Sequence, residues 1–229
     1  HEKMCIERRL GCQPYTMESH NVVVEPPTAD WLKEKDAIII GGSGDFSVHH
    51  PMSERWVTPL RTVVDAALKQ KLPGFGLCFG HQLLGFHLGQ AVVTDPERSE
   101  LGTVDIELTA TGQTSSLYEG VRPVFRAHCG HSDHVVGVPP GVDVLASNAC
   151  VDTQAFHVRG THFYSTQFHP DMSGEEARYR YLAYREGFAS RIDPNARKFA
   201  DRFIPDEDES LVLLGRFLEL VAGDLGLTE

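Results

Sequence analysis

The sequence predicts an α/β fold with a mostly parallel central sheet, helices on both faces of that sheet, and a small antiparallel or mixed β region. Three observations support this prediction. Short apolar runs alternate with helical patterns in residues 1–90, and the connections between them are short. Segments of alternating polarity fill the middle of the chain. Continuous apolar runs suit parallel strands covered on both faces, whereas alternating segments suit antiparallel strands.

The first third of the chain alternates helix and strand patterns. Residues 2–10 have a helical pattern that ends at Gly11, and residues 21–25 (NVVVE) form a β-branched run typical of a strand. A short helix over residues 29–35 and an apolar strand over residues 36–40 (DAIII) are expected next.

A glycine-rich loop, GGSGDFSVHHP, occupies residues 41–51. Beyond it, Thr58 and Pro59 fit the cap and the first position of a helix that extends to about Leu72.

The run GFGL at residues 74–77 predicts the next strand, which leads through Cys78 into a helix ending near Gly89. Strand and helix patterns that alternate in this way indicate parallel strands joined by right-handed crossovers.

The middle of the chain is β-rich and its last part is helical. Strands of antiparallel or mixed pairing are expected at residues 101–108, 142–147, 153–158 and 161–168. Helices are expected near residues 173–189 and 208–222.

The composition of the 229-residue chain excludes several classes of protein. Its length suits one α/β domain, so we expect a single domain over residues 1–229 with a helical C-terminal extension from residue 173. A net charge of −11 offers no basic surface for nucleic acid. The chain has neither the run of about 18 apolar residues that spans a membrane nor a signal peptide, so we expect a cytoplasmic protein.

The cysteines argue against a disulfide framework or a zinc ribbon, because their number is odd and they form no C-x-x-C pair. They are Cys5, Cys12, Cys78, Cys129 and Cys150.

Cys78 lies in the stretch GFGLCFGHQ, between Gly76 and Gly80. A nucleophile on a strand-to-helix turn needs small neighbours, because the turn is strained and a substrate carbonyl must come close. The N-terminus of the following helix favours a thiolate and offers N–H donors to an oxyanion. A cysteine packed between helix and sheet explains the same pattern, so the stretch alone leaves both interpretations open.

A thiol nucleophile needs a base, and His169 in STQFHPD is the strongest candidate. Pro170 fixes the chain after it, and Asp171 lies where a carboxylate would bind one imidazole nitrogen and leave the other for sulfur. A histidine at a strand end beside a helix-capping aspartate is the alternative.

The motifs GLCFGHQ (76–82) and QFHPD (167–171), in that order, resemble the class I (triad) glutamine amidotransferases, such as the GMP synthase-like domains. The resemblance covers residues 21–172 and implies a flavodoxin-like sheet and no cofactor. It also implies that Cys78 attacks the side-chain amide of glutamine, that ammonia leaves, and that water releases glutamate from a γ-glutamyl thioester. His169 would act as base and then acid, and Asp171 would orient it.

Two further segments match this family. IIIGGSGD (38–45) resembles a loop whose backbone N–H completes the oxyanion hole, which implies donors at Gly42 and Phe79 and a substrate contact at Gly44. An ordinary glycine-rich βα turn and a phosphate-binding loop are the alternatives for it, and the absence of a following G-K-[ST] argues against the phosphate-binding loop.

Gln82 matches a glutamine that contacts substrate in the family, and GHSDHV (130–135) resembles a loop that holds the two ends of the substrate. The implied contacts there are His131, Ser132 and Asp133. A zinc site is the competing interpretation of His128, Cys129, His131 and His134. Because the resemblance explains His131 and Asp133 without a metal, we expect no metal.

The chain departs from the family in three ways. Asp171 stands where the motif usually has glutamate, which predicts a weakened triad. The chain opens with a helical pattern where the family has a strand, so we expect that a strand precedes it. It also has no synthetase domain, so the expected partners are glutamine or a γ-glutamyl compound and a separate acceptor enzyme. A γ-glutamyl hydrolase or peptidase, and a degenerate regulatory subunit, remain the alternative functions.

Overall fold

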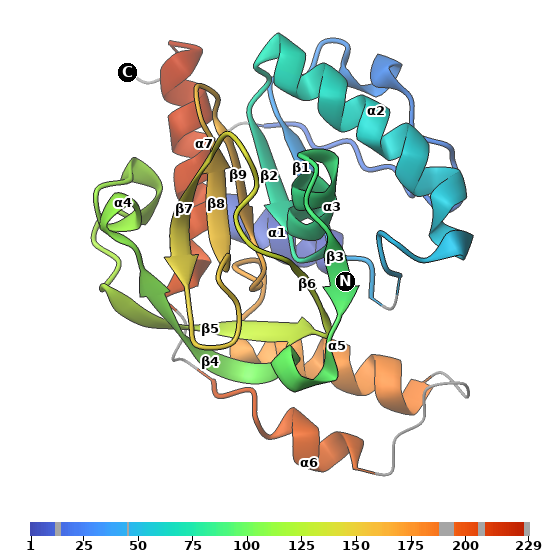
Figure 1. Cartoon of the computed structure of the whole chain (residues 1–229). Coiled ribbons are helices and arrows are strands. Elements are labelled where there is room, and N and C mark those ends of the chain that lie inside the picture. Colours follow the sequence, from blue (N-terminus) through green and yellow to red (C-terminus); the bar gives the residue numbers. More distant parts are fainter. Residues whose placement is uncertain (12–14, 45, 188–194, 206–208, 227–229) are drawn as a thin grey trace.

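The computed structural model describes residues 1–11, 15–44, 46–187, 195–205 and 209–226 (Figure 1). Its centre is a seven-stranded sheet with the order β1-β2-β9-β8-β7-β4-β5. The strands of this sheet are β1 (Ile38–Ile40), β2 (Gly74–Leu77), β4 (Glu100–Leu108), β5 (Val124–His131), β7 (Val142–Ser147), β8 (Ala155–Val158) and β9 (Phe163–Thr166). A second sheet pairs β3 (Val92–Thr94) with β6 (Asp133–Val135).

The large sheet is mixed. The pairs β1–β2 and β2–β9 are parallel, whereas every pair from β9 onward in the sheet order is antiparallel. The predicted α/β class is therefore confirmed, and the antiparallel part is larger than the sequence indicated. Strands β7, β8 and β9 follow one another through short connections, which join antiparallel neighbours rather than parallel ones.

Helices cover both faces of the sheet, as predicted. One face carries α1 (Glu2–Leu10) and α7 (Leu213–Asp224), and the other carries α2 (Glu54–Gln70) and α3 (Phe79–His87). The remaining helices are α4 (Ala110–Gln113), α5 (Gly174–Gly187) and α6 (Ala196–Ala200).

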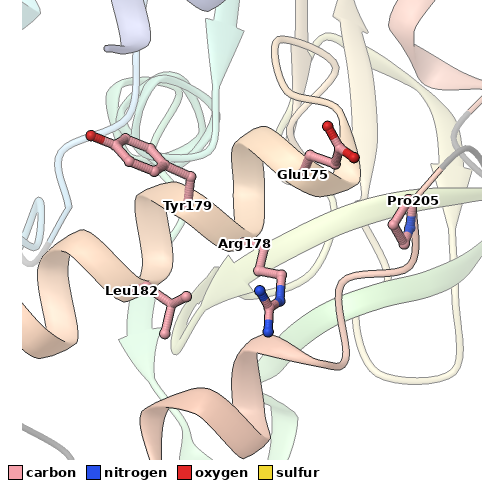
Figure 2. Close-up of a pocket in the computed structure, with 5 residues that line it drawn as sticks. All are labelled: Glu175, Arg178, Tyr179, Leu182 and Pro205. Atoms are coloured by element: carbon pink, nitrogen blue, oxygen red, sulfur yellow. The ribbon is translucent and has the colours of Figure 1, made fainter.

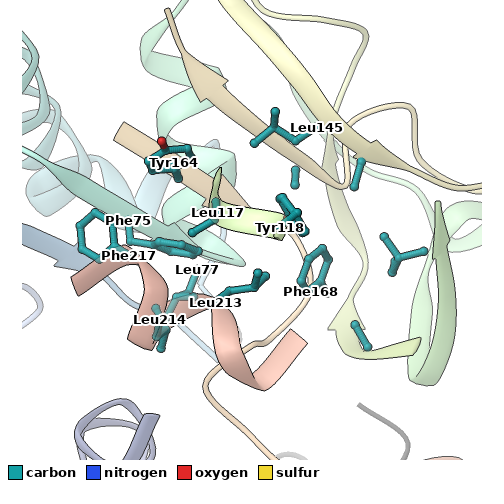
Figure 3. Close-up of a cluster of buried hydrophobic side chains, with 14 of the residues drawn as sticks. Phe75, Leu77, Leu117, Tyr118, Leu145, Tyr164, Phe168, Leu213, Leu214 and Phe217 are labelled. Carbon is teal, nitrogen blue, oxygen red and sulfur yellow. The ribbon is translucent and has the colours of Figure 1, made fainter. Parts of the chain in front are cut away.

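Each face has its own hydrophobic core. Figure 3 shows the one beneath α7, where Phe75 and Leu77 of β2 pack with Phe217. The rings of Phe75 and Phe217 meet edge to face with centroids 5.5 Å apart. On the other face, Trp56 of α2 and Leu83 of α3 belong to a second buried cluster. Strand β2 is therefore packed on both sides, which fixes the position of the turn that follows it.

The strand expected at residues 21–25 is wrong. Asn21 closes a turn there: its carbonyl accepts from the Glu25 N–H at 2.8 Å, and its side-chain Oδ1 accepts from the Val23 N–H at 3.1 Å. Val24 is 79% exposed. The asparagine supplies local hydrogen-bond partners that compete with strand pairing, which outweighs the β-branched composition.

The start expected for the second helix is also wrong. Helix α2 begins at Glu54 rather than after Thr58, so Pro59 lies inside it. A 3₁₀ turn over Pro51–Ser53, capped by His50 Nδ1 accepting from the Met52 N–H, starts the helix early. Pro59 then costs the helix a single backbone hydrogen bond near its first turn.

The helix expected at residues 29–35 is a 3₁₀ helix over Ala29–Leu32. The other predicted elements are present, with shifts of a few residues at their ends, whereas strands β3, β5 and β6 were not predicted. Among the helices of the described residues, none combines the length and apolar character that a membrane crossing needs.

Candidate active site

Cys78 lies on a sharp turn between β2 and α3. Its backbone has φ 48° and ψ −93°, a conformation that residues with a side chain seldom adopt. Two backbone hydrogen bonds hold the turn: Cys78 N–H donates to the Thr166 carbonyl at 2.8 Å, and Gln82 N–H donates to the Cys78 carbonyl at 3.1 Å. The cysteine is partly exposed. This is the strained strand-to-helix elbow that presents a nucleophile.

The glycines beside Cys78 are required by close packing between β1, β2 and α3. A Cβ added to Gly80 would lie 2.3 Å from the carbonyl oxygen of Ile40, and one added to Gly76 would lie 2.7 Å from the carbonyl carbon of Gly80. Because the contacted atoms belong to the backbone, the clash cannot be relieved by a change of side-chain rotamer. These glycines therefore fix how closely the helix bearing Cys78 approaches β1.

His169 follows β9 and lies between the thiol and a carboxylate. Its Nδ1–H donates to Asp171 Oδ1 at 3.0 Å, and the imidazole also interacts with Cys78. Burial lowers the pKa of His169, but the interactions with Asp171 and Cys78 outweigh burial and raise it to about 10. The three side chains predicted as a triad thus converge in one place.

Asp171 is 0% exposed and uses both of its carboxylate oxygens. Oδ1 accepts from His169, and Oδ2 accepts from Arg180 Nη2 on α5 at 3.1 Å. Burial raises the pKa of Asp171, but His169 and Arg180 more than offset burial, so that the pKa lies below its ordinary value of 3.8. The buried carboxylate is therefore ionised and fully bonded.

Gly42 lies against the imidazole, because a Cβ added to it would be 3.4 Å from His169 Cε1. Its N–H donates to Glu2 Oε1 at 2.6 Å, and this oxygen lies 3.8 Å from Arg180 Nη1. Burial and the charge of Asp171 raise the pKa of Glu2. The N–H expected to bind an oxyanion is thus occupied by a side-chain carboxylate of α1.

The other expected contacts of this loop and of the elbow are placed as follows. Gly44 has φ +68°, and a Cβ there would lie 2.9 Å from the hydroxyl oxygen of Tyr184 on α5. Phe79 begins α3, so its N–H follows Cys78 directly, and its ring packs against Trp56 with centroids 5.3 Å apart. Asp45, at the end of the loop motif, lies outside the described residues.

Two glutamines connect Cys78 to the start of β6. Gln167 Nε2 donates to Cys78 Sγ at 3.6 Å, and Gln82 Nε2 donates both to Gln167 Oε1 at 3.2 Å and to the Asp133 carbonyl at 2.9 Å. Gln82 was expected to contact substrate, but its amide nitrogen here donates hydrogen bonds to two other groups of the protein. Gln167 was not singled out, although it lies inside the QFHPD motif.

His131 lies in the buried interior rather than at an open surface. Its Nε2 is hydrogen-bonded to Glu100 Oε2 and its Nδ1 to the Asp133 carbonyl, each at 3.1 Å. The Asp133 side chain accepts from Thr94 Oγ1 at 2.6 Å. Ser132 is exposed, and its carbonyl accepts from the Asp95 N–H at 2.9 Å. His131 therefore holds the loop that Gln82 also holds, and Ser132 lies at the outer side of that loop.

One cluster of metal-ligand types is present among the described residues: single ligand atoms of Glu100, Cys129 and His131 lie within 4.8 Å of one another. Hydrogen bonds already account for it. Glu100 accepts from Asn148 Nδ2 at 2.7 Å, from Gln154 and from His131, and these bonds outweigh burial and lower its pKa. Both nitrogens of His131 face acceptors, so this arrangement fits a polar network better than a cation.

Comparison with known proteins decides the family. Residues 5–185 match the sequence profile described as glutamine amidotransferase class-I. The chain belongs to this family. The glutamine-hydrolyzing GMP synthase subunit of Sulfurisphaera tokodaii is 31% identical over 145 residues, which is 63% of this chain and 72% of that protein. The subunit of the same name from Saccharolobus solfataricus is 30% identical over 168 residues, 73% of this chain and 80% of that protein.

Solved structures share the fold. A glutamine amidotransferase from Thermotoga maritima has a TM-score of 0.63 at 21% identity, covering 83% of this chain and 79% of that one. A protein from Thermoplasma acidophilum, described as a GMP synthase subunit, has a TM-score of 0.62 at 16% identity, covering 87% and 79%. The resemblance found in the motifs is therefore confirmed, and the chain is a class I glutamine amidotransferase domain with the α/β fold of that family.

Two charged residues of the amidotransferase site were missed from the sequence. Glu2 lies on α1, far from the motifs in the sequence. Arg180 lies on α5, nine residues after Asp171, and further arginines on that helix give it no distinguishing feature. Spacing could have offered one hint, since α5 begins just after the QFHPD motif and Arg180 lies in its second turn, only nine residues from Asp171.

Helix α5 also borders a pocket on its outer side (Figure 2). Its lining residues are Glu175, Arg178, Tyr179, Leu182 and Pro205. None of them belongs to the predicted site of the amidotransferase.

Proposed function

We propose that this amidotransferase hydrolyses glutamine at Cys78 and supplies the ammonia to a synthetase on a separate chain. The observation that carries the proposal is the convergence of Cys78, His169 and Asp171 on a strained elbow. The two archaeal relatives are named as subunits of a glutamine-hydrolysing GMP synthase, which supports a partner chain. The cytoplasmic location expected from the sequence stays a prediction.

The first half-reaction forms a thioester. Cys78 gives its thiol proton to His169, the thiolate sulfur attacks the carbonyl carbon of the glutamine side chain, and the carbonyl oxygen takes up the negative charge. The C–N bond then breaks as the imidazolium of His169 gives its proton to the leaving nitrogen, so that ammonia departs and a γ-glutamyl thioester remains. Asp171 holds the Nδ1–H of His169, which keeps Nε2 directed at the sulfur and the leaving group.

The second half-reaction releases glutamate. His169, now neutral, accepts a proton from water, and the resulting hydroxide adds to the thioester carbonyl. The C–S bond breaks and the thiolate of Cys78 is restored beside the imidazolium. The charge of Arg180 and its hydrogen bond lower the pKa of Asp171 against the effect of burial, which helps to keep the carboxylate ionised through both half-reactions.

The oxyanion would be held by the N–H groups of Phe79 and Gly42. Phe79 N–H stands at the start of α3, and Gly42 N–H becomes available when Glu2 moves away. Gly44, Gln82 and the loop with Asp133 would border the substrate, with His131 holding that loop and Ser132 exposed at its tip.

A glutaminase assay tests this function. We expect the wild-type chain to release glutamate and ammonia from glutamine in equal amounts, and Cys78→Ala to release neither. Full activity in Cys78→Ala would overturn the role of the cysteine.

Turnover of γ-glutamyl peptides in preference to glutamine would favour the hydrolase alternative. A folded wild-type chain that turns over neither substrate would favour the regulatory one.

A further inference from the structure

The guanidinium of Arg180 lies directly behind the pair of His169 and Asp171. Its Nη2 donates to Asp171 Oδ2 at 3.1 Å, its Nε donates to His1 Nδ1 at 3.2 Å, and its Nη1 lies 3.8 Å from Glu2 Oε1. The Arg180 side chain is only 16% exposed. A buried arginine whose three nitrogens all have partners is held in one orientation, so it offers Asp171 a fixed donor.

Asp171 needs such a donor to act on His169. The last torsion of an aspartate side chain is broad, so a carboxylate bonded through one oxygen can turn and weaken that bond. Asp171 is 0% exposed, and bulk water therefore does not reach Oδ2. A second donor on Oδ2 fixes the plane of the carboxylate and so places Oδ1 on the imidazole.

We propose that Arg180 is a positioning residue of this amidotransferase: by binding Oδ2 of Asp171 it holds Oδ1 on His169 Nδ1 and thereby directs Nε2 at Cys78. Arg180 acts through Asp171 and does not touch the reacting atoms. The proposal rests on the triad described under the proposed function. It gives α5 a part in catalysis, since this helix carries the donor to the end of the sheet.

The charges around Asp171 set the direction of the expected pH effect. His169 faces it from the segment after β9 and Arg180 from α5, and Glu2 and Cys5 face it from α1. Without the Arg180 cation, burial and the charge of Glu2 make Asp171 easier to protonate. A protonated Asp171 supports an imidazolium poorly, so the acidic limb of activity moves to higher pH.

The first test compares Arg180→Met with Arg178→Met in the glutaminase assay. Arg178 lies on the same helix, and its Nη2 donates to Asp201 Oδ1 at 2.7 Å on the exposed surface, so it controls for loss of an α5 ion pair. We expect Arg180→Met to lower kcat about 10- to 100-fold, the usual effect of losing a charged hydrogen bond, with little change in KM. Arg178→Met should match the wild type.

A double-mutant cycle tests the route of the effect. If Arg180 acts only through Asp171, adding Arg180→Met to Asp171→Asn lowers kcat no further than Asp171→Asn alone. A further loss in the double variant would overturn the proposal, because Arg180 would then act elsewhere. Arg180→Lys keeps the charge but places all donors on one nitrogen, which cannot span the three partners of the guanidinium, so we expect a loss between those of the wild type and Arg180→Met.

A third readout does not depend on glutamine turnover. The rate at which iodoacetamide alkylates Cys78, followed by mass spectrometry of its peptide, reports the thiolate–imidazolium pair. We expect the acidic limb of this rate to move to higher pH in Arg180→Met and not in Arg178→Met. If the wild type hydrolyses no glutamine yet this limb still moves, the proposed function fails and the role of Arg180 stands.

If Arg180→Met leaves both kcat and the acidic limb of the Cys78 alkylation rate unchanged, the positioning role of Arg180 is refuted. Urea unfolding checks that each variant is folded. If Arg180→Met is not folded, Arg180→Lys is tested instead, by kcat and by the pH dependence of Cys78 alkylation. The proposal is overturned if both quantities in Arg180→Lys equal those in Arg178→Met.

Discussion

Gly80→Ala offers a direct perturbation of the elbow without touching a catalytic side chain. The added Cβ would stand 2.3 Å from the carbonyl oxygen of Ile40 and 3.1 Å from its carbonyl carbon. Both are backbone atoms of β1, which pairs with β2 in the large sheet. Relief therefore requires α3 to move away from β1.

The size of the effect follows from that distance. A shift of about 1 Å restores ordinary van der Waals separation between the Cβ and the oxygen. Overpacking of this kind costs about 1–3 kcal/mol in the free energy of unfolding, against which alanine returns about 0.5–1 kcal/mol of helix propensity. The shift also moves Cys78 relative to Gly42, and a misplacement of about 1 Å can lower kcat about 100-fold.

Urea unfolding and the glutaminase assay measure the two effects. Gly223→Ala is the matched control: Gly223 also lies in a helix, α7, and a Cβ there has no atom within 4 Å. We expect Gly223→Ala to be stabilised by up to about 1 kcal/mol with wild-type kcat. Gly80→Ala with the stability and kcat of Gly223→Ala would refute the account of the close helix–strand contact.

Three further predictions concern the charged residues. Asp171→Ala should lower kcat about 10²- to 10⁴-fold, since His169 loses its orienting partner, whereas Asp171→Glu should retain more activity than the alanine variant; a fully active alanine variant would contradict the orienting role. Glu2→Ala frees the Gly42 N–H, so kcat/KM for glutamine should rise, by up to about tenfold, and a fall would show that Glu2 assists instead. The pKa of His169 is raised from 6.5 to about 10, so its stabilising contribution is full below pH 6.5 and is lost as the pH rises through 10. The difference in urea unfolding free energy between the wild type and His169→Gln should therefore shrink between those pH values, and a difference that grows would contradict it.

Local motifs made the centre of the site predictable. Cys78, His169 and Asp171 lie in short stretches whose neighbouring residues are themselves explained by local structure. Gly76 and Gly80, for example, are the small residues that the elbow at Cys78 requires. The strands β1 and β2 were predictable because both are short apolar runs bounded by turn residues. Features that depend on residues close together in the sequence, such as turns and short motifs, can be predicted from the sequence alone.

Long-range contacts were not predictable in the same way. Arg180 is nine residues from Asp171 in the sequence, but it reaches the carboxylate only because of where α5 lies in the fold, and Glu2 reaches Gly42 across 40 residues. The turn at Asn21 also overrode a β-branched run, since a local hydrogen bond decided what composition left open. Such partners depend on tertiary packing, which no local pattern encodes.

Covalent labelling at Cys78 tests the central claim most directly. A glutamine-like diazo ketone, incubated with the folded chain at neutral pH, should attach to the peptide that contains Cys78 and not to those with Cys5, Cys12, Cys129 or Cys150. Excess glutamine should slow this labelling, because both compounds occupy the same site. A folded chain whose Cys78 stays unlabelled, or is labelled no faster than the other cysteines, would contradict the assignment of Cys78 as the nucleophile.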